Sequence, residues 1–89
     1  LMYPTLMLDV RGLNHPEPLE KSVATFRRMD SDDIFRLVIH RLPQPLLMIA
    51  EKHGIRYRVC RISEEEWHIW FTKNENVDLT ACCSGEEDV

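Results

Sequence analysis

The opening stretch of the chain alternates between apolar and polar side chains. Leu6, Leu8 and Val10 occupy every second position, which predicts a strand with one buried face. Gly12 ends this alternation, and a polar bend follows it. The same kind of alternation returns in residues 35–40, which predicts a second strand.

A helical spacing follows each of these two strands. Leu19, Val23 and Phe26 lie at positions i, i+4 and i+7, so residues 18–29 are predicted to form a helix with one apolar stripe. A shorter helix is predicted for residues 45–53. Both helices begin at a proline, which the first turn tolerates because a backbone N–H has no partner there.

Two further alternating stretches complete the pattern. Residues 55–62 and 67–72 are each predicted to form a strand, and the polar run between them predicts a turn. The order is therefore βαβαββ, an α/β fold of the two-layer α+β sandwich type. Right-handed crossovers would place both helices on one face of a four-stranded mixed sheet. The first two strands would be parallel, and the last two would form an antiparallel hairpin.

The second face of the predicted sheet has no helix to cover it. By alternation, its side chains are Met7, Asp9, Arg11, Arg36, Val38, His40, Arg56, Arg58, Cys60, His68 and Trp70. An exposed tryptophan among polar groups is typical of a contact surface. Two other placements stay open for Trp70, beneath the C-terminal tail or at the seam of a homodimer.

Charge divides the chain into two parts. Residues 1–73 carry 11 Lys or Arg and 10 Asp or Glu, whereas residues 74–89 carry five acids and no base. We therefore expect a single domain over residues 1–73 and a disordered acidic tail over residues 74–89. A near-neutral domain makes nucleic acid an unlikely partner, since domains that bind nucleic acid are usually strongly basic.

The sequence favours neither a membrane protein nor a cysteine-based metal site. No apolar run approaches the roughly 20 residues that a membrane helix needs. The three cysteines are an odd number and lack metal-ligand spacing. Because no secretory signal is evident, we expect a reducing, cytoplasmic compartment. Cys60 would then be an inert thiol in a strand, and Cys82 and Cys83 would lie in the flexible tail.

Residues 8–19, Leu-Asp-Val-Arg-Gly-Leu-Asn-His-Pro-Glu-Pro-Leu, resemble the signature of the TusA/SirA sulfur-carrier family. That signature combines leucine-aspartate and glycine-leucine with cysteine-proline-x-proline at the start of the first helix. The resemblance extends over about residues 6–72. It implies the TusA-like two-layer sandwich, which is similar to the C-terminal domain of initiation factor 3.

A second proline bend, residues 40–46, is not typical of the sulfur carriers. Its sequence, His-Arg-Leu-Pro-Gln-Pro-Leu, is more similar to a TusA-like group of unknown function. Members of that group commonly have aspartate-arginine-x-proline-x-proline-leucine there, and some are attached to hemerythrin-like domains. His40 stands where that aspartate is usual.

His15 stands where the sulfur carriers have their cysteine. Sulfur transfer requires a thiolate that accepts sulfur as a persulfide, and a helix start lowers the pKa of such a thiol. An imidazole cannot hold a persulfide, so the family's reaction does not carry over to residue 15. We therefore predict a small non-catalytic binding or adaptor module without a cofactor, present as a monomer or weak homodimer.

The two proline bends are the predicted working edge of this module. The carboxyl ends of neighbouring parallel strands meet at one edge of a sheet, where ligands of open α/β sheets tend to bind. Arginines beside two helix starts suit a small anionic ligand or the carboxylate of a protein partner. The candidate binding residues are Arg11, Asn14, His15, Glu17, His40 and Arg41.

Two alternative functions stay open. His15 and His40 would form an incomplete zinc site, to which Glu17 would add a third ligand. A sulfur-transfer or redox-associated carrier would instead use a tail thiol, Cys82 or Cys83.

Overall fold

The structure, a computed structural model, describes residues 2–83. Its elements are β1 (Leu6–Asp9), α1 (Glu17–Arg28), β2 (Ile34–Ile39), α2 (Gln44–Lys52), β3 (Arg56–Ser63), β4 (Glu66–Thr72) and a 3-10 helix, η1 (Leu79–Cys83). The predicted βαβαββ order is confirmed, and η1 is an addition that the sequence pattern did not indicate. Within this described part, no helix combines the length and the apolar character needed to cross a membrane.

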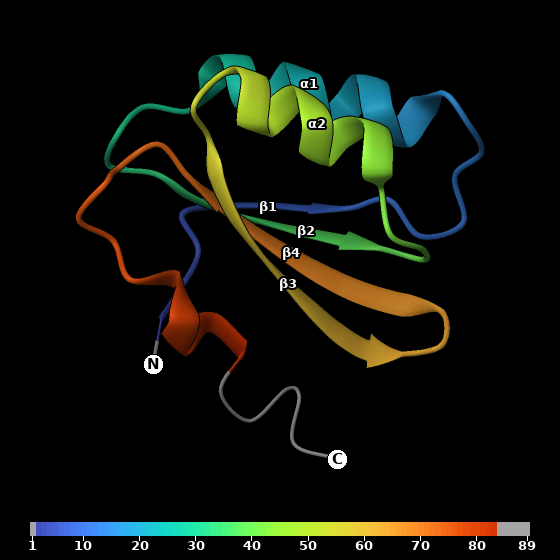
Figure 1. Cartoon of the computed structure of the whole chain (residues 1–89). Coiled ribbons are helices and arrows are strands. Elements are labelled where there is room, and N and C mark those ends of the chain that lie inside the picture. The colour runs from blue at the N-terminus through green and yellow to red at the C-terminus, as the bar shows by residue number, and fades with distance from the viewer. Residues whose placement is uncertain (1, 84–89) are drawn as a thin grey trace.

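The four strands form one mixed sheet in the order β1-β2-β4-β3. β1 and β2 are parallel, whereas β4 is antiparallel to both of its neighbours, β2 and β3. Both helices lie on the same face of the sheet (Figure 1), so the predicted two-layer arrangement is confirmed. Because β1 and β2 are parallel neighbours, the loops that follow them leave the sheet at the same end, where the carboxyl ends of both strands lie.

Aromatic rings form the centre of the layer between the helices and the sheet. Phe26 of α1 stands edge-on to Phe71 of β4, with ring centroids 4.8 Å apart. Phe71 also stacks on Phe35 of β2, at a centroid distance of 5.4 Å. Leu37 and Ile69 are fully buried beside these rings. Burial of each such side chain contributes about 2 kcal/mol, so this cluster holds the helix layer against the sheet.

The carboxyl ends of the two helices lie away from the proline bends. Lys73 caps the end of α1, and Gly54 follows the end of α2. The ammonium group of Lys73 donates hydrogen bonds to the carbonyl oxygens of Phe26 at 2.7 Å and of Met29 at 2.8 Å. These bonds satisfy carbonyl groups that a helix end leaves without partners. Gly54 follows α2 with φ +71°, a left-handed conformation that favours glycine.

The segment after β4 is ordered as far as residue 83, so the prediction of a disordered tail is wrong for residues 74–83. The segment ends in η1, which lies on the sheet face opposite the helices (Figure 1). A disulfide joins Cys83 of η1 to Cys60 of β3, with their Cα atoms 5.5 Å apart. The prediction that Cys60 is an inert thiol is therefore also wrong. Residues 84–89, the rest of the predicted tail, lie outside the described residues.

Trp70 shows how this segment changes the second face of the sheet. Its side chain is only 2% exposed, because it packs with Leu79, Cys82 and the disulfide. Trp70 is therefore not part of an exposed contact surface, and its placement beneath the C-terminal segment is confirmed. The part of this face over β1 stays open, as the 57% exposure of Met7 indicates.

Candidate functional site

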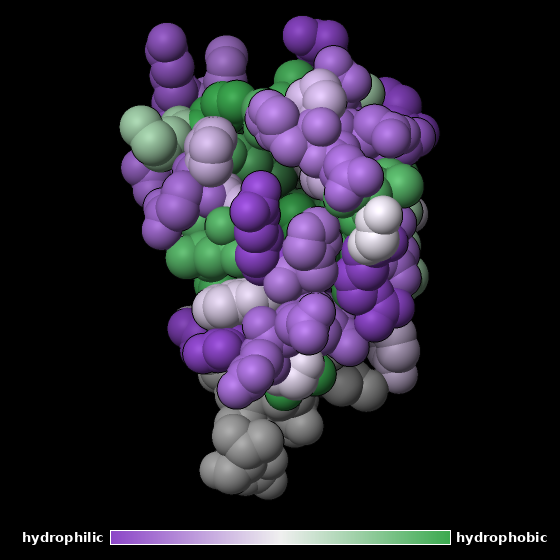
Figure 2. All heavy atoms as spheres, turned by 90° about the vertical axis from the view of Figure 1, so that its right-hand side faces the viewer, coloured by the Kyte–Doolittle hydropathy of each residue, from purple (hydrophilic) through white to green (hydrophobic). Residues whose placement is uncertain are grey.

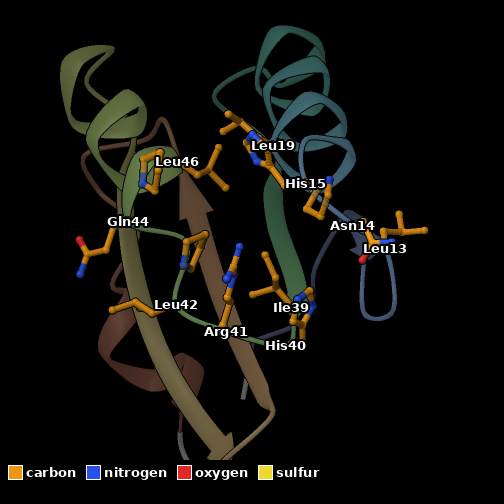
Figure 3. A pocket seen from close by; sticks show the side chains of 13 residues that line it. Leu13, Asn14, His15, Leu19, Ile39, His40, Arg41, Leu42, Gln44 and Leu46 are labelled. Atoms are coloured by element: carbon orange, nitrogen blue, oxygen red, sulfur yellow. The ribbon is translucent and has the colours of Figure 1, made fainter.

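The two proline bends enclose a pocket at the end of the sheet where β1 and β2 terminate. Its volume is about 390 Å³, and it lies between the starts of α1 and α2 (Figure 3). The first bend contributes residues 13–15, together with Pro18 and Leu19 of α1. The second side is a continuous segment, residues 39–46, which includes the end of β2 and the start of α2. The predicted meeting of the two bends is therefore confirmed.

The start of α1 presents one backbone N–H group that has no acceptor. The N–H of Glu17 donates to the carbonyl oxygen of Asn14 at 3.0 Å, and that of Glu20 donates to Pro16 at 3.0 Å. Pro18 lies between them and has no N–H. The N–H of Leu19 is the donor that remains, since no hydrogen bond occupies it within residues 2–83.

The start of α2 repeats this arrangement. The N–H of Gln44 donates to Leu42 at 3.1 Å, and that of Leu47 donates to Pro43 at 3.0 Å, while Pro45 has no N–H. The N–H of Leu46 is left without an acceptor in the described part of the chain. The repeated Pro-x-Pro-Leu sequence accounts for this, because its second proline removes one donor and its leucine supplies the one that remains. Among the described residues, no side chain forms a capping hydrogen bond at either helix start.

His40 directly follows β2 and lines the pocket. Its Nδ1 atom is buried, and none of the described residues forms a hydrogen bond with it. A buried polar atom without a hydrogen-bond partner costs free energy. His40 therefore has a ring nitrogen for which none of residues 2–83 supplies a hydrogen bond.

Four exposed polar side chains complete the pocket. Asn14 and His15 belong to the first bend, and Arg41 and Gln44 belong to the second. Figure 3 shows Arg41 extending from its loop toward the space between the two helix starts. Throughout residues 2–83, none of these four side chains has a hydrogen-bond or ion-pair partner. Arg41 is therefore a positive charge in the pocket that no carboxylate of the described residues neutralises.

Gly12 shapes the first bend. It has a φ of +86°, a left-handed backbone conformation that residues other than glycine rarely adopt. The N–H of Leu13 then donates to the carbonyl oxygen of Val10 at 3.2 Å, which turns the chain away from the sheet and toward α1. The peptide bond between His15 and Pro16 is cis.

Two of the predicted site residues do not line the pocket. Arg11 lies on the open sheet face, where it forms ion pairs with Asp9 at 2.7 Å and with Glu66 at 3.1 Å. The hydrogen bond from Arg11 lowers the pKa of the Asp9 carboxyl below its ordinary value. Glu17 is exposed in the first turn of α1 and is absent from the residues that line the pocket.

The arrangement of possible metal ligands is incomplete. His15 and His40 both line the pocket, but the third predicted ligand, Glu17, does not. No cluster of three or more His, Cys, Asp or Glu suited to a metal ion occurs within residues 2–83. Two imidazoles are fewer protein ligands than zinc normally has.

The two tail cysteines are both buried. Cys83 is part of the disulfide, and Cys82 is 5% exposed with its Sγ atom 3.4 Å from the Sδ atom of Met2. Sulfur transfer requires an accessible thiolate. The structure therefore presents neither residue in the form that a sulfur carrier needs.

The pocket has an apolar wall that the sequence reasoning missed. Leu13, Leu19 and Leu42 pack against the main core, and Ile39 and Leu46 are buried in it. Figure 2 looks onto this end of the molecule and shows hydrophobic residues between hydrophilic ones. The leucine that follows each Pro-x-Pro sequence, Leu19 or Leu46, could have predicted this wall. These leucines were assigned only to the two helices, although they also line the space between the bends.

The comparisons with known proteins identify a family without an assigned role. A family model described as "Uncharacterized conserved protein (DUF2249)" matches residues 7–73, which is most of the chain and includes both proline bends. No curated protein and no solved structure matches the chain significantly.

Proposed function

We propose that this chain, which belongs to the DUF2249 family of uncharacterized conserved proteins, is a non-catalytic binding or adaptor module. The pocket between the proline bends binds an anionic group, carried by a small molecule or by a protein partner. The proposal includes a TusA-like relationship in which sulfur-carrier chemistry has been lost, since His15 occupies the position of the cysteine.

The observation that carries this proposal is that several residues lining the pocket have hydrogen-bond donors without acceptors. Arg41 and the N–H groups of Leu19 and Leu46 have no acceptor within residues 2–83, and the Nδ1 atom of His40 has no hydrogen-bond partner there either. None of the described residues that line the pocket is acidic. An anion would accept hydrogen bonds from these groups, whereas a cation would meet donors and a positive charge.

Electrostatics favours the same conclusion. Helix starts carry a partial positive charge, and two of them lie on either side of the pocket into which Arg41 extends. A hydrogen bond to a charged group contributes about 2 kcal/mol, which is more than a tenfold change in affinity. Loss of Arg41 should therefore weaken anion binding at least tenfold.

Titration with sodium acetate, sodium phosphate and sodium hexanoate, followed by amide and imidazole NMR signals at constant ionic strength, tests the proposal. The signals of His15, Leu19, His40 and Leu46 should shift together along one binding curve. The indole N–H of Trp70, which is buried on the other face of the sheet, should stay unchanged. Shifts confined to Trp70 and β3 would contradict the proposal, as would the absence of saturable shifts with all three anions.

A pair of matched variants separates the pocket from general surface charge. Arg41→Gln should weaken binding at least tenfold. Arg28→Gln, which removes an exposed arginine from the other end of α1, should leave binding unchanged. Equal losses in the two variants would show that binding depends only on net charge.

A further inference from the structure

The pocket combines a polar rim with an apolar wall, and this combination restricts the ligand. The apolar wall consists of leucine and isoleucine side chains, namely Leu13, Leu19, Ile39, Leu42 and Leu46. Pockets of this kind bind the apolar body of a ligand along the hydrophobic side chains and orient it through a few polar groups. An inorganic anion would leave the apolar wall unused.

The size of the pocket also exceeds what a small anion would fill. Its volume is about 390 Å³, which falls within the roughly 300–1,000 Å³ typical of pockets that bind small organic molecules. Acetate or phosphate would occupy a minor part of it and leave the rest to solvent.

The donors themselves suit a carboxylate better than a phosphate. Sites that hold phosphate at a helix start use several consecutive backbone N–H groups, usually in a glycine-rich loop. Here Pro18 and Pro45 each remove one such group, so Leu19 and Leu46 are the only unpaired N–H donors at the two helix starts in the described chain. Arg41 provides a planar fork that matches the two oxygen atoms of one carboxylate.

We infer that the ligand is an organic monocarboxylate with an apolar body. Its carboxylate group meets Arg41 and the N–H groups of the helix starts, and its hydrocarbon part lies along the wall formed by Leu13 and Leu42. This inference rests on the proposed function, because it names the chemical class of the anion that the pocket binds. A free aliphatic acid and the C-terminal residue of a peptide both present this chemistry.

Binding of a series of straight-chain acids, from acetate through butyrate and hexanoate to octanoate, tests the inference on the full-length protein. Each methylene group that the wall buries should raise the affinity about fourfold, until the pocket is filled. Hexanol should bind at least tenfold more weakly than hexanoate, since it lacks the charge that Arg41 meets.

Comparison with the smaller anions separates this inference from the proposed function. If acetate and phosphate bind as tightly as hexanoate, the pocket binds anions and the inferred ligand class is wrong. If neither the acids nor phosphate produce saturable shifts, the proposed function fails as well. N-acetyl-leucine mimics the C-terminal residue of a peptide, and its amide lacks the carboxylate. If the free acid binds and the amide does not, the C-terminal residue of a peptide is supported as a source of the ligand. Binding of the amide as tightly as the free acid would overturn the inference.

Variants of the wall provide a second measurement. Leu42→Ala should weaken hexanoate binding severalfold and leave acetate binding unchanged, while Arg41→Gln should weaken both. Met48→Ala, which truncates an apolar side chain on α2 that is 67% exposed and outside the pocket, is the matched control. Leu13→Ala repeats the wall test if the change at Leu42 lowers the thermal stability. Unchanged hexanoate binding in both folded wall variants would refute the inference.

Discussion

Reduction of the disulfide between Cys60 and Cys83 is expected to release the C-terminal segment and to destabilise the domain. The disulfide joins residues with a sequence separation of 23, and the chain-entropy relation assigns about 3 kcal/mol to a loop of that length. The ordering of each residue costs about 1 kcal/mol. Residues 74–83 bury few apolar side chains, and the largest of them, Leu79, contributes about 2 kcal/mol. The segment therefore depends on the disulfide for its position on the sheet.

Urea unfolding with and without dithiothreitol measures this contribution. In a Trp67→Phe background Trp70 is the remaining tryptophan, because the chain has two. The free energy of unfolding should fall by about 3 kcal/mol on reduction. Before unfolding begins, the emission of Trp70 should shift to the red, since its 2% exposed indole would come into contact with water.

Two cysteine variants provide the controls. Cys82→Ala retains the disulfide and should respond to dithiothreitol as the parent protein does. Cys60→Ala removes the disulfide and should be less stable from the start, with no response to the reductant. The reasoning is refuted if reduction changes the free energy of unfolding by less than about 0.5 kcal/mol, the usual range for a surface change, and leaves the emission of Trp70 unchanged.

Two further predictions concern the core and the carboxylates. Phe71→Ala removes a fully buried ring and should lower the free energy of unfolding by about 4 kcal/mol, measured by urea unfolding, whereas Met48→Ala on the exposed side of α2 should have little effect. Hydrogen bonds lower the pKa values of Asp9, Asp33 and Asp78 in the folded state from the ordinary 3.8. These carboxylates therefore stabilise the fold above about pH 4, and this contribution is lost as the pH falls through the lowered pKa values. Urea midpoints that stay constant from neutral pH down to about pH 2 would contradict this.

The strands and helices were predictable because each depends on side chains that are close in the sequence. The alternation from Leu6 to Val10 follows from the pleat of a strand, which sends successive side chains to opposite faces. Phe26 could be assigned to the core because it continues the apolar stripe of α1. The parallel pairing of the first two strands followed from the helix between them, which returns the chain to the starting end of the sheet. The right-handedness of such crossovers then placed both helices on one face.

The covering of the second sheet face was not predictable from local patterns. Residues 79–83 have no strand or helix periodicity, and their burial depends on contact with Trp70, which is distant in sequence. Three cysteines allow more than one pairing, so the sequence alone does not select Cys60 and Cys83. The acidic composition of the tail favoured disorder, but most of its acids lie beyond the buried Leu79.

The candidate site was predictable where it depends on the two bends. Asn14, His15, His40 and Arg41 line the pocket because both bends follow parallel neighbouring strands. Arg11 was assigned from the sequence both to the site at the proline bends and to the sheet face opposite the helices. Its ion pairs with Asp9 and Glu66 hold it on that sheet face. The apolar wall depends on how the two helix starts pack together, which no single motif describes.

The outer strands of the sheet bear on how copies of this protein meet in solution. β1 and β3 are at the two edges of the sheet, where backbone groups are open to another chain. β1 has four residues, and β3 carries Arg56, Arg58 and Arg61 with a break in register between Arg61 and Ser63. Short, cationic or irregular edges resist the addition of a further strand. The fold therefore protects itself against edge-to-edge growth into aggregates, and crowding at high concentration should not extend the sheet from one molecule to the next.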